Sequence, residues 1–206
     1  MTPIERLPTE ERQEQIAEAA LRIISNQGVR RLTAAALAAE VGIADGTIFR
    51  HFKDKEAIVD AAIDLFEASL EDCYPAPSDE PLERLGAFLM KRVARVRKHP
   101  EILRLAFSDR LAEAAGEAGA ARVEQLVARS VVFVQDCLAA AQRKGLITRD
   151  TPVMLLTWMV IGVVRGVSVP GATQIRGAKS LSTASPRKIW MDLERCLRQT
   201  GPEVME

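Results

Sequence analysis

Histidine, cysteine and aromatic residues are scarce in this chain of 206 residues. It contains only two histidines, which are too few for a histidine-based zinc site. Its three cysteines are an odd number, widely spaced and without a Cys-x-x-Cys pair, namely Cys73, Cys137 and Cys196. This pattern is typical of reduced, mostly buried thiols in a cytoplasmic protein and excludes a disulfide framework. We therefore expect neither a metal site nor a cofactor.

The chain also lacks an excess of either charge. Lysine and arginine together number 28, as do aspartate and glutamate, so the formal net charge is zero. Global charge therefore does not indicate nucleic-acid binding, and any such function must depend on local charge. Between Arg30 and Lys55, five cationic side chains face three carboxylates, a net of +2. A dimer would carry this modest basic region twice.

No segment has the length and composition of a membrane span. The longest apolar run, residues 153–169, has 17 residues and contains Arg165, and prolines flank it on both sides. A transmembrane helix needs about 20 apolar residues. A buried core helix explains this run better. The first six residues contain no apolar signal core, so nothing in them suggests export.

Recognisable catalytic motifs are missing as well. The sequence has no Gly-x-Ser-x-Gly elbow, no phosphate-binding loop and no set of metal ligands. We identify no catalytic residue. An enzyme remains only as an alternative, in which His99 would have to act without an evident nucleophile beside it.

Apolar residues recur with helical periodicity along most of the sequence, and no strand-length alternation of apolar and polar residues occurs. We predict an all-α fold of about nine helices, four in an N-terminal head and five in a second bundle. Three prolines between residues 74 and 81 mark a joint. The expected parts are a head over residues 1–53, a connecting helix over 54–73 and a helical domain over 82–206. Residues 112–121 are expected to be a loop or a frayed helix end, and residues 170–185 a mobile connection.

The stretch from Thr33 to Lys55 predicts a helix-turn-helix. Thr33 is suited to cap a short first helix, and Gly42 is suited to end it in the left-handed conformation. The second helix is expected over about residues 44–52. Ile48 and Phe52 are four positions apart and should face inward, which leaves the polar side chains between them outside.

These residues resemble the N-terminal domain of the tetracycline-repressor (TetR) family of bacterial transcription regulators. The resemblance rests on the following segments: Leu32-Thr33, Leu37-Ala38, Val41-Gly42-Ile43, Gly46 to Phe52, and Lys55-Glu56. It covers about the first quarter of the chain. Two positions depart from the family pattern, because Ala44 replaces a frequent capping serine and Phe49 a frequent tyrosine. The resemblance implies a double-stranded DNA operator as partner.

The expected DNA contacts come from both helices of this motif. Hydroxyls at helix starts bind phosphate together with backbone amides. The resemblance places Gly46 close to DNA, Phe49 and His51 against the sugar-phosphate chain, and Lys55 on a phosphate. Arg50 and Asp45 are the candidates for reading base edges, since arginine suits guanine and a carboxylate accepts a hydrogen bond from cytosine N4. The alternative role of Asp45 is to place a negative charge at the start of its helix. The predicted contact residues are Thr33, Asp45, Gly46, Thr47, Phe49, Arg50, His51 and Lys55.

The resemblance further implies a homodimer and a small-molecule site in the second domain. The candidate dimer residues are Trp158, Trp190, Leu193 and Leu197. The candidate pocket residues are Phe88, His99, Leu103, Phe107, Phe133, Met154, Met159 and Arg165. Ordinary core packing is the alternative for the apolar members of both sets. Arg165 needs an acceptor in so apolar a helix, either a carboxylate of the protein or an acidic ligand.

The resulting hypothesis is a repressor that leaves a pseudo-palindromic operator when an unidentified small molecule binds its second domain. The partners would be operator DNA, a second copy of the chain and that effector, with no membrane. The alternative is a DNA-binding or architectural protein without an effector. The size of a ligand-induced drop in DNA affinity distinguishes the two.

Overall fold

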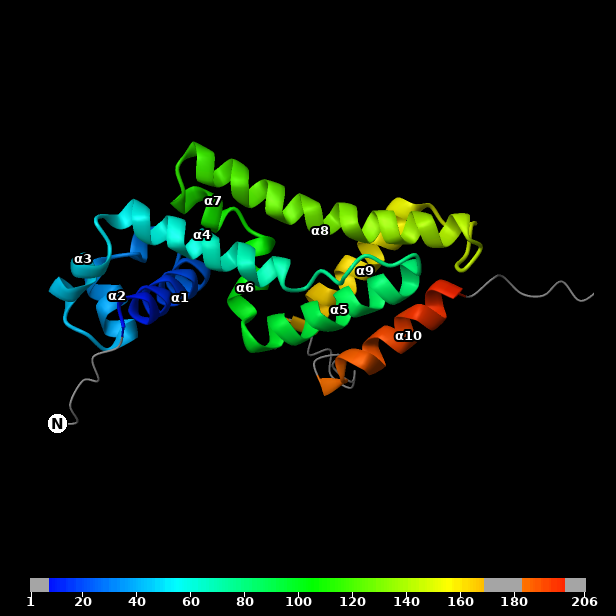
Figure 1. Cartoon of the computed structure of the whole chain (residues 1–206), viewed down its shortest axis with the longest axis horizontal. Helices are drawn as coiled ribbons and strands as arrows, with labels where there is room; N and C mark the ends of the chain where they lie inside the picture. The colour runs from blue at the N-terminus through cyan, green and yellow to red at the C-terminus, as the bar shows by residue number, and fades with distance from the viewer. Residues whose placement is uncertain (1–7, 169–182, 199–206) are drawn as a thin grey trace, which may run out of the picture. The chain divides into compact units, whose positions relative to one another are not determined.

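A computed structural model of the chain describes residues 8–168 and 183–198 (Figure 1). The described residues form ten α-helices and two short 3-10 helices, with no strand among them. In chain order the elements are α1 (Thr9–Gln27), η1 (Val29–Arg31), α2 (Ala34–Val41), η2 (Asp45–Thr47), α3 (Ile48–His51), α4 (Lys55–Glu71), α5 (Pro81–Lys98), α6 (Pro100–Ala106), α7 (Arg110–Ala114), α8 (Glu117–Arg143), α9 (Val153–Ser168) and α10 (Pro186–Arg198). The predicted all-α class is confirmed.

The tract over residues 112–121 differs from the expectation, because most of it is helical. Helix α7 ends at Ala114 and α8 already begins at Glu117. Alanine is the strongest helix former and outweighs the two glycines that suggested a loop. A Cβ atom at Gly119 would lie 3.2 Å from the Ile63 Cδ1 atom of α4, so glycine permits close packing here. Helix α7 is therefore an additional short element before α8.

The chain divides into two compact units. The N-terminal unit contains residues up to 69 together with 104–126, and the C-terminal unit contains 70–103 and the residues from 127 onward. Helices α4 and α8 each contribute residues to both units. The sequence did not indicate that residues 104–126 group with the N-terminal residues. Much of the residue 170–185 connection lies outside the described residues.

Polar contacts tie residues 104–126 into the N-terminal unit. The Arg104 Nε atom donates to the Ser25 hydroxyl at 2.9 Å, and Arg110 donates to the Ser25 carbonyl. Arg122 binds Glu67 and also Asp64, the latter at 2.8 Å. The hydrogen bonds that Arg122 donates to Glu67, and then to Asp64, raise the pKa of Arg122 above its ordinary value. These contacts join α6, α7 and α8 to α1 and α4.

Apolar side chains of α1 and its neighbours fill the N-terminal unit. The predicted stripe on α1 is buried throughout, and Ile16 and Ile24 have no exposed surface. The side chains of Ile48 and Phe66 are also fully buried. Burying each such side chain contributes about 1.5–3 kcal/mol, so this core fixes the orientation of the short helices that follow α1.

The C-terminal unit is built on α5, which packs against α9 and α10 (Figure 1). Gly86 on α5 lies directly beneath the indole of Trp190 on α10. The Ser185 hydroxyl accepts a hydrogen bond from the Lys188 amide at 3.2 Å, so Ser185 caps α10 as predicted. The side chains of Trp190, Leu193 and Leu197 belong to the hydrophobic core of this unit.

Helix α9 is not buried on all sides, which corrects the expectation drawn from its apolar run. One face, which includes Leu156, Val160 and Val164, packs in the core. The opposite face exposes large apolar side chains, and Leu155 and Trp158 are 54% and 52% exposed. The helix is covered on one side only, because it packs against α5 by a single stripe of residues four apart. No helix in the described ranges is both long and apolar enough to span a bilayer.

Candidate nucleic-acid interface

The first helix of the predicted helix-turn-helix begins and ends as its sequence indicates. The Thr33 hydroxyl accepts a hydrogen bond from the Ala36 amide at 3.1 Å, which caps α2. Gly42 has φ +77° and ψ +37°, the left-handed conformation that favours glycine. The amides of Gly42 and Ile43 both donate to the Ala38 carbonyl, at 2.8 and 2.9 Å. The chain therefore turns sharply toward the second helix.

Removing the cap of α2 should have a measurable effect on stability. We expect the Thr33→Ala variant to lose about 0.5–2 kcal/mol of unfolding free energy, because the Ala36 amide loses its acceptor. Urea denaturation followed by circular dichroism measures this change. Thr33→Ser retains the hydroxyl and serves as the control. A Thr33→Ala variant as stable as the parent would show that the cap contributes nothing.

The second helix begins with a tighter turn than expected. Residues 45–47 form the 3-10 helix η2, and the regular helix α3 covers only residues 48–51. Ala44 offers no side-chain cap at its start, and the Asp45 carboxylate instead accepts from the Gly46 amide at 2.9 Å. The Thr47 amide donates to the Ala44 carbonyl at 2.9 Å, the short-range bond that closes a 3-10 turn.

Helix α1 holds both helices of this motif through side-chain hydrogen bonds. The Gln13 amide donates to the His51 carbonyl at 2.8 Å, at the end of α3. The Arg22 Nε atom donates to the Glu40 carboxylate at 2.8 Å, on α2. Ile48 and Phe52 are buried beneath α3, as predicted. The backbone of the motif is thereby fixed, and its outer side chains project from a rigid support.

The predicted DNA-contact residues lie on the surface of this motif. Asp45, Gly46, Phe49, Arg50 and Lys55 are exposed, and Phe49 retains 55% of its accessible surface. Thr33 is also exposed, whereas Thr47 and His51 are partly buried. A large exposed phenyl group next to a guanidinium is typical of a binding surface rather than of a monomer's solvent face.

The carboxylates of this region are largely engaged by other groups. Glu40 is paired with Arg22 at 2.8 Å. Asp54 caps α4 through the Ala57 amide at 2.8 Å and lies 3.8 Å from the Lys53 ammonium. The cations at positions 30, 31, 50, 53 and 55 are all exposed.

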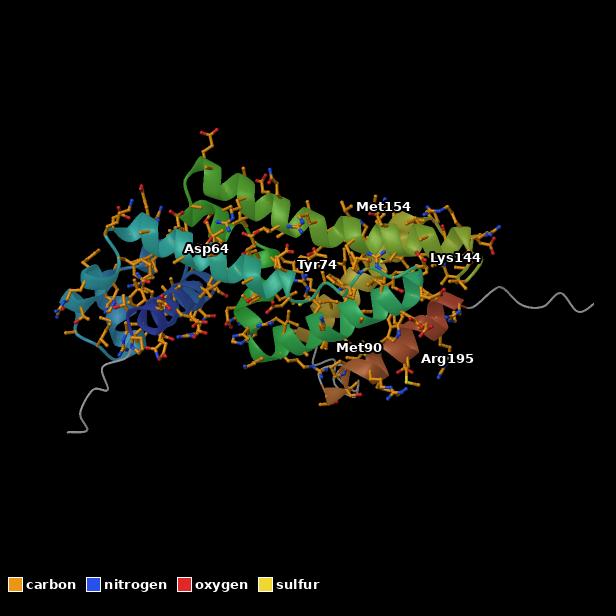
Figure 2. All side chains as sticks on the ribbon, in the orientation of Figure 1. Asp64, Tyr74, Met90, Lys144, Met154 and Arg195 are labelled. Atoms are coloured by element: carbon orange, nitrogen blue, oxygen red, sulfur yellow. The ribbon has the colours of Figure 1, made fainter. Side chains whose placement is uncertain are left out.

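The residues predicted for an effector pocket are not gathered in one place. Phe88 and Leu103 are in the core of the C-terminal unit, and the Phe133 ring lies 4.8 Å from the Phe88 ring between centroids. His99 contacts the Glu101 carboxylate at 3.3 Å. Phe107 belongs to the N-terminal unit and is partly exposed. The other three are exposed on α9, namely Met154 (Figure 2), Met159 and Arg165.

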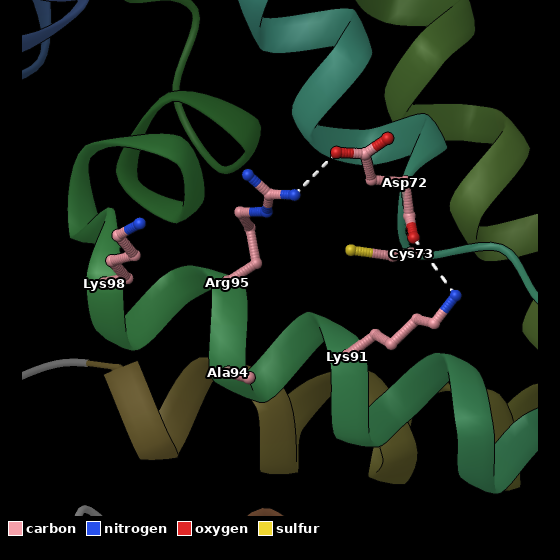
Figure 3. A pocket seen from close by; sticks show the side chains of 6 residues that line it. All are labelled: Asp72, Cys73, Lys91, Ala94, Arg95 and Lys98. Carbon is pink, nitrogen blue, oxygen red and sulfur yellow. Dashed lines mark hydrogen bonds and ion pairs between the residues drawn. The ribbon is translucent and has the colours of Figure 1, made fainter.

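The structure instead shows a cavity of about 490 Å³ in the C-terminal unit (Figure 3). Six residues line it: Asp72, Cys73, Lys91, Ala94, Arg95 and Lys98. None of these six was among the residues predicted from the sequence for an effector pocket. The signal that could have found the cavity is the spacing of three cations on α5, four and then three residues apart, which places them on one face.

Of the four residues predicted for a subunit interface, only Trp158 is exposed. Trp190, Leu193 and Leu197 are buried within their own chain. Their side chains hold α10 in the C-terminal unit. The outward apolar surface therefore belongs to α9 and not to the predicted stripe on α10.

An all-α chain that presents a capped, glycine-cornered helix pair with an exposed basic second helix is a helix-turn-helix DNA-binding protein. Comparison with known proteins agrees, since residues 16–62 match the family described as bacterial regulatory proteins, tetR family. Over these residues the chain resembles the DNA-binding part of the TetR family.

Curated relatives and solved structures extend the comparison. The nucleoid occlusion factor SlmA of Sodalis glossinidius is 31% identical over 98 residues, which are 46% of this chain and 50% of SlmA. The chain thus matches about half the length of these relatives. The ketosteroid transcriptional regulator KstR2 of Mycobacterium tuberculosis has a TM-score of 0.65 at 19% identity, covering 92% of this chain and 96% of KstR2. AibR, solved with isovaleryl coenzyme A and operator DNA, has a TM-score of 0.64 at 20% identity, covering 91% and 98%. These structures share the fold.

Proposed function

We propose that this protein is a homodimeric, sequence-specific transcriptional repressor in the cytoplasm that leaves a pseudo-palindromic operator when a small molecule binds its C-terminal unit. The observation that carries the proposal is the rigidly held helix-turn-helix with Phe49, Arg50 and Lys55 exposed on its outer side. The match of residues 16–62 to the TetR family supports a DNA-binding regulator. What we propose beyond this is that the protein represses transcription and that a small-molecule effector controls it.

Each exposed group of the motif has a proposed role on DNA. The hydroxyls of Thr33 and Thr47 stand at helix starts, where they bind phosphate oxygens beside backbone amides. Nothing lies within 4 Å of a Cβ atom placed at Gly46, so DNA can approach the backbone there. Phe49 and His51 contact the sugar-phosphate chain, and Lys55 binds a phosphate. Arg50 and Asp45 read base edges.

The exposed face of α9 is the proposed dimer surface. Met154, Leu155, Trp158 and Met159 are all at least 44% exposed, and together they form an apolar surface on one helix. Tryptophan and methionine are enriched in the buried centres of protein interfaces. A second copy of the same face would cover them through a twofold axis. That symmetry places two recognition helices on half-sites of one operator.

The proposed effector response acts through α4. This helix begins at Lys55 in the DNA-binding motif and ends at Glu71, in the C-terminal unit. In this scheme the dimer has one state that holds both half-sites and one that does not. A ligand that binds the second state more tightly shifts the population toward it, and its difference in affinity for the two states sets the drop in operator affinity. The structural neighbour AibR supports ligand control in this fold, since it was solved with a small molecule and operator DNA.

A DNA-binding protein without an effector is the second candidate. The sequence relatives give it weak support, because they are nucleoid occlusion factors that match less than half of this chain. In that case operator affinity would not respond to any small molecule. The coupling between ligand and DNA binding therefore separates the two functions.

Fluorescence anisotropy against a selected operator and a scrambled duplex tests the DNA contacts. We expect Arg50→Ala to reduce discrimination between the two duplexes by about 1–3 kcal/mol, because a base contact is lost. Lys55→Ala should weaken binding to both duplexes alike and reduce the salt slope by about one, because a phosphate contact is lost. Arg187→Ala, which removes an exposed cation of α10, is the control. Parent-like binding by both DNA-face variants would refute the assignment.

A further inference from the structure

Three cationic side chains of α5 converge on the C-terminal end of α4, and Figure 3 shows two of them, Lys91 and Arg95. Arg92 donates to the Leu70 carbonyl at 3.4 Å, and Lys91 donates to the Asp72 carbonyl at 3.4 Å. Arg95 donates to the Asp72 carboxylate at 2.6 Å. Carbonyls at a helix C-terminus carry negative partial charge and attract cations. The end of α4 is therefore held by charge as well as by packing.

The cavity beside this contact contains more positive than negative charge. Lys91, Arg95 and Lys98 line it, and Asp72 is the one carboxylate among the described residues of the lining. The net charge of the lining is thus +2. Lys91 and Arg95 are also four positions apart on α5, where like charges destabilise a helix. Glu71, the next carboxylate along the chain, is engaged by Arg129 at 2.8 Å.

Two buried groups behind the cavity leave this excess uncompensated. The Cys73 thiol is buried, and this desolvation raises its pKa, so it stays neutral and adds no negative charge. Arg92 is only 6% exposed, and its hydrogen bonds go to neutral oxygens, the Leu70 carbonyl and the Ser130 hydroxyl at 3.1 Å. Its guanidinium also lies 4.9 Å from the Phe88 ring centroid. Burial lowers the pKa of Arg92 from its ordinary value.

We propose that this cavity binds the phosphate group of a small molecule through Lys91, Arg95 and Lys98. A doubly charged oxyanion balances the net charge of +2 on the lining, whereas a monocarboxylate neutralises only half of that charge. Guanidinium groups bind phosphate with paired hydrogen bonds, and lysine binds it as a point charge. The volume of about 490 Å³ lies within the range of small-molecule sites and holds more than the phosphate alone.

Binding at this site would also change how α4 is held, a step that rests on the proposed function. The bound anion competes with Asp72 for Arg95, since both are oxyanion acceptors for the same guanidinium. Loss of the Arg95–Asp72 pair weakens the attachment of the chain immediately after α4. Helix α4 carries Lys55 at its other end. A phosphate-bearing effector would therefore act on operator affinity through this helix.

Isothermal titration calorimetry of the full chain with sodium pyrophosphate, without DNA and at fixed ionic strength, tests the binding step. We expect saturable binding of one anion per chain. The double variant Arg95→Gln/Lys98→Gln should bind about tenfold or more weakly, since two charge-assisted bonds are lost. Arg187→Gln/Lys188→Gln makes the same change of residue types and charge on α10 and should bind like the parent. Circular dichroism checks that each variant is folded.

A third variant gives a prediction of opposite sign. Asp72→Asn removes the carboxylate that competes for Arg95, so pyrophosphate binding should become several-fold tighter. Asp72 is exposed, so the variant should keep its global fold although it lacks the ion pair with Arg95. The site is refuted if the parent shows no saturable binding, if the Arg95/Lys98 variant binds like the parent, or if Asp72→Asn binds more weakly.

Adding operator DNA separates this inference from the proposed function. Operator affinity measured without pyrophosphate tests DNA recognition alone. A saturated site that leaves operator affinity unchanged would overturn the coupling through α4 while the phosphate site stands. Operator release by pyrophosphate in the parent, absent in Arg95→Gln/Lys98→Gln, supports both.

Discussion

Replacing Trp158 by glutamate is expected to make the protein monomeric and to lower its operator affinity by about a hundredfold or more. The side chain is 52% exposed in the centre of the apolar face of α9. A carboxylate buried there by a second subunit would have no partner, and burying an unpaired charge is costly. Two linked recognition helices bind far more tightly than one, so loss of the dimer removes that gain.

Light scattering after size-exclusion chromatography reports the oligomeric state, and anisotropy reports operator affinity. Val132→Glu is a matched control, because Val132 on α8 is also 52% exposed and apolar but does not belong to the α9 face. We expect this control to remain dimeric and to bind operator like the parent. A dimeric Trp158→Glu variant, or a monomeric parent that binds a palindrome tightly, would contradict the proposed interface.

Gly86→Val is expected to lower the unfolding free energy by about 3 kcal/mol, the upper part of the range for overpacking. A Cβ atom at Gly86 would lie 2.5 Å from the Trp190 Cε2 atom and 2.6 Å from its Nε1 atom. Trp190 is buried in the core of the C-terminal unit and has little room to move. The clash outweighs the fraction of a kcal/mol that valine gains over glycine in helix propensity.

A double-mutant cycle with Trp190→Leu tests the cause of this loss. The smaller side chain leaves room above position 86, so Gly86→Val should cost much less in that background. Chemical denaturation of the four proteins gives the coupling energy. Additive effects of the two substitutions would show that the indole is not what excludes a side chain at position 86. A parent-like Gly86→Val would refute the close approach of α5 and α10.

The sequence by itself determined the fold class and the local form of the DNA-binding motif. The cap at Thr33, the left-handed turn at Gly42 and the buried pair Ile48 and Phe52 all depend on neighbouring residues. Such interactions span four residues or fewer, so spacing along the chain is enough to predict them. The tight first turn over residues 45–47 was not predicted, although the sequence showed that Ala44 offers no cap there.

Tertiary structure decided which apolar and charged side chains are covered. Helices α9 and α10 each carry a tryptophan predicted for the subunit interface, yet Trp190 is buried against α5 while Trp158 is exposed. Likewise the cations of α5 define a cavity only because Asp72 and Cys73, far away in the chain, lie against them. The periodicity of apolar residues predicts which residues share one face of a helix. It does not predict what packs against that face, because this depends on segments that are distant in the chain.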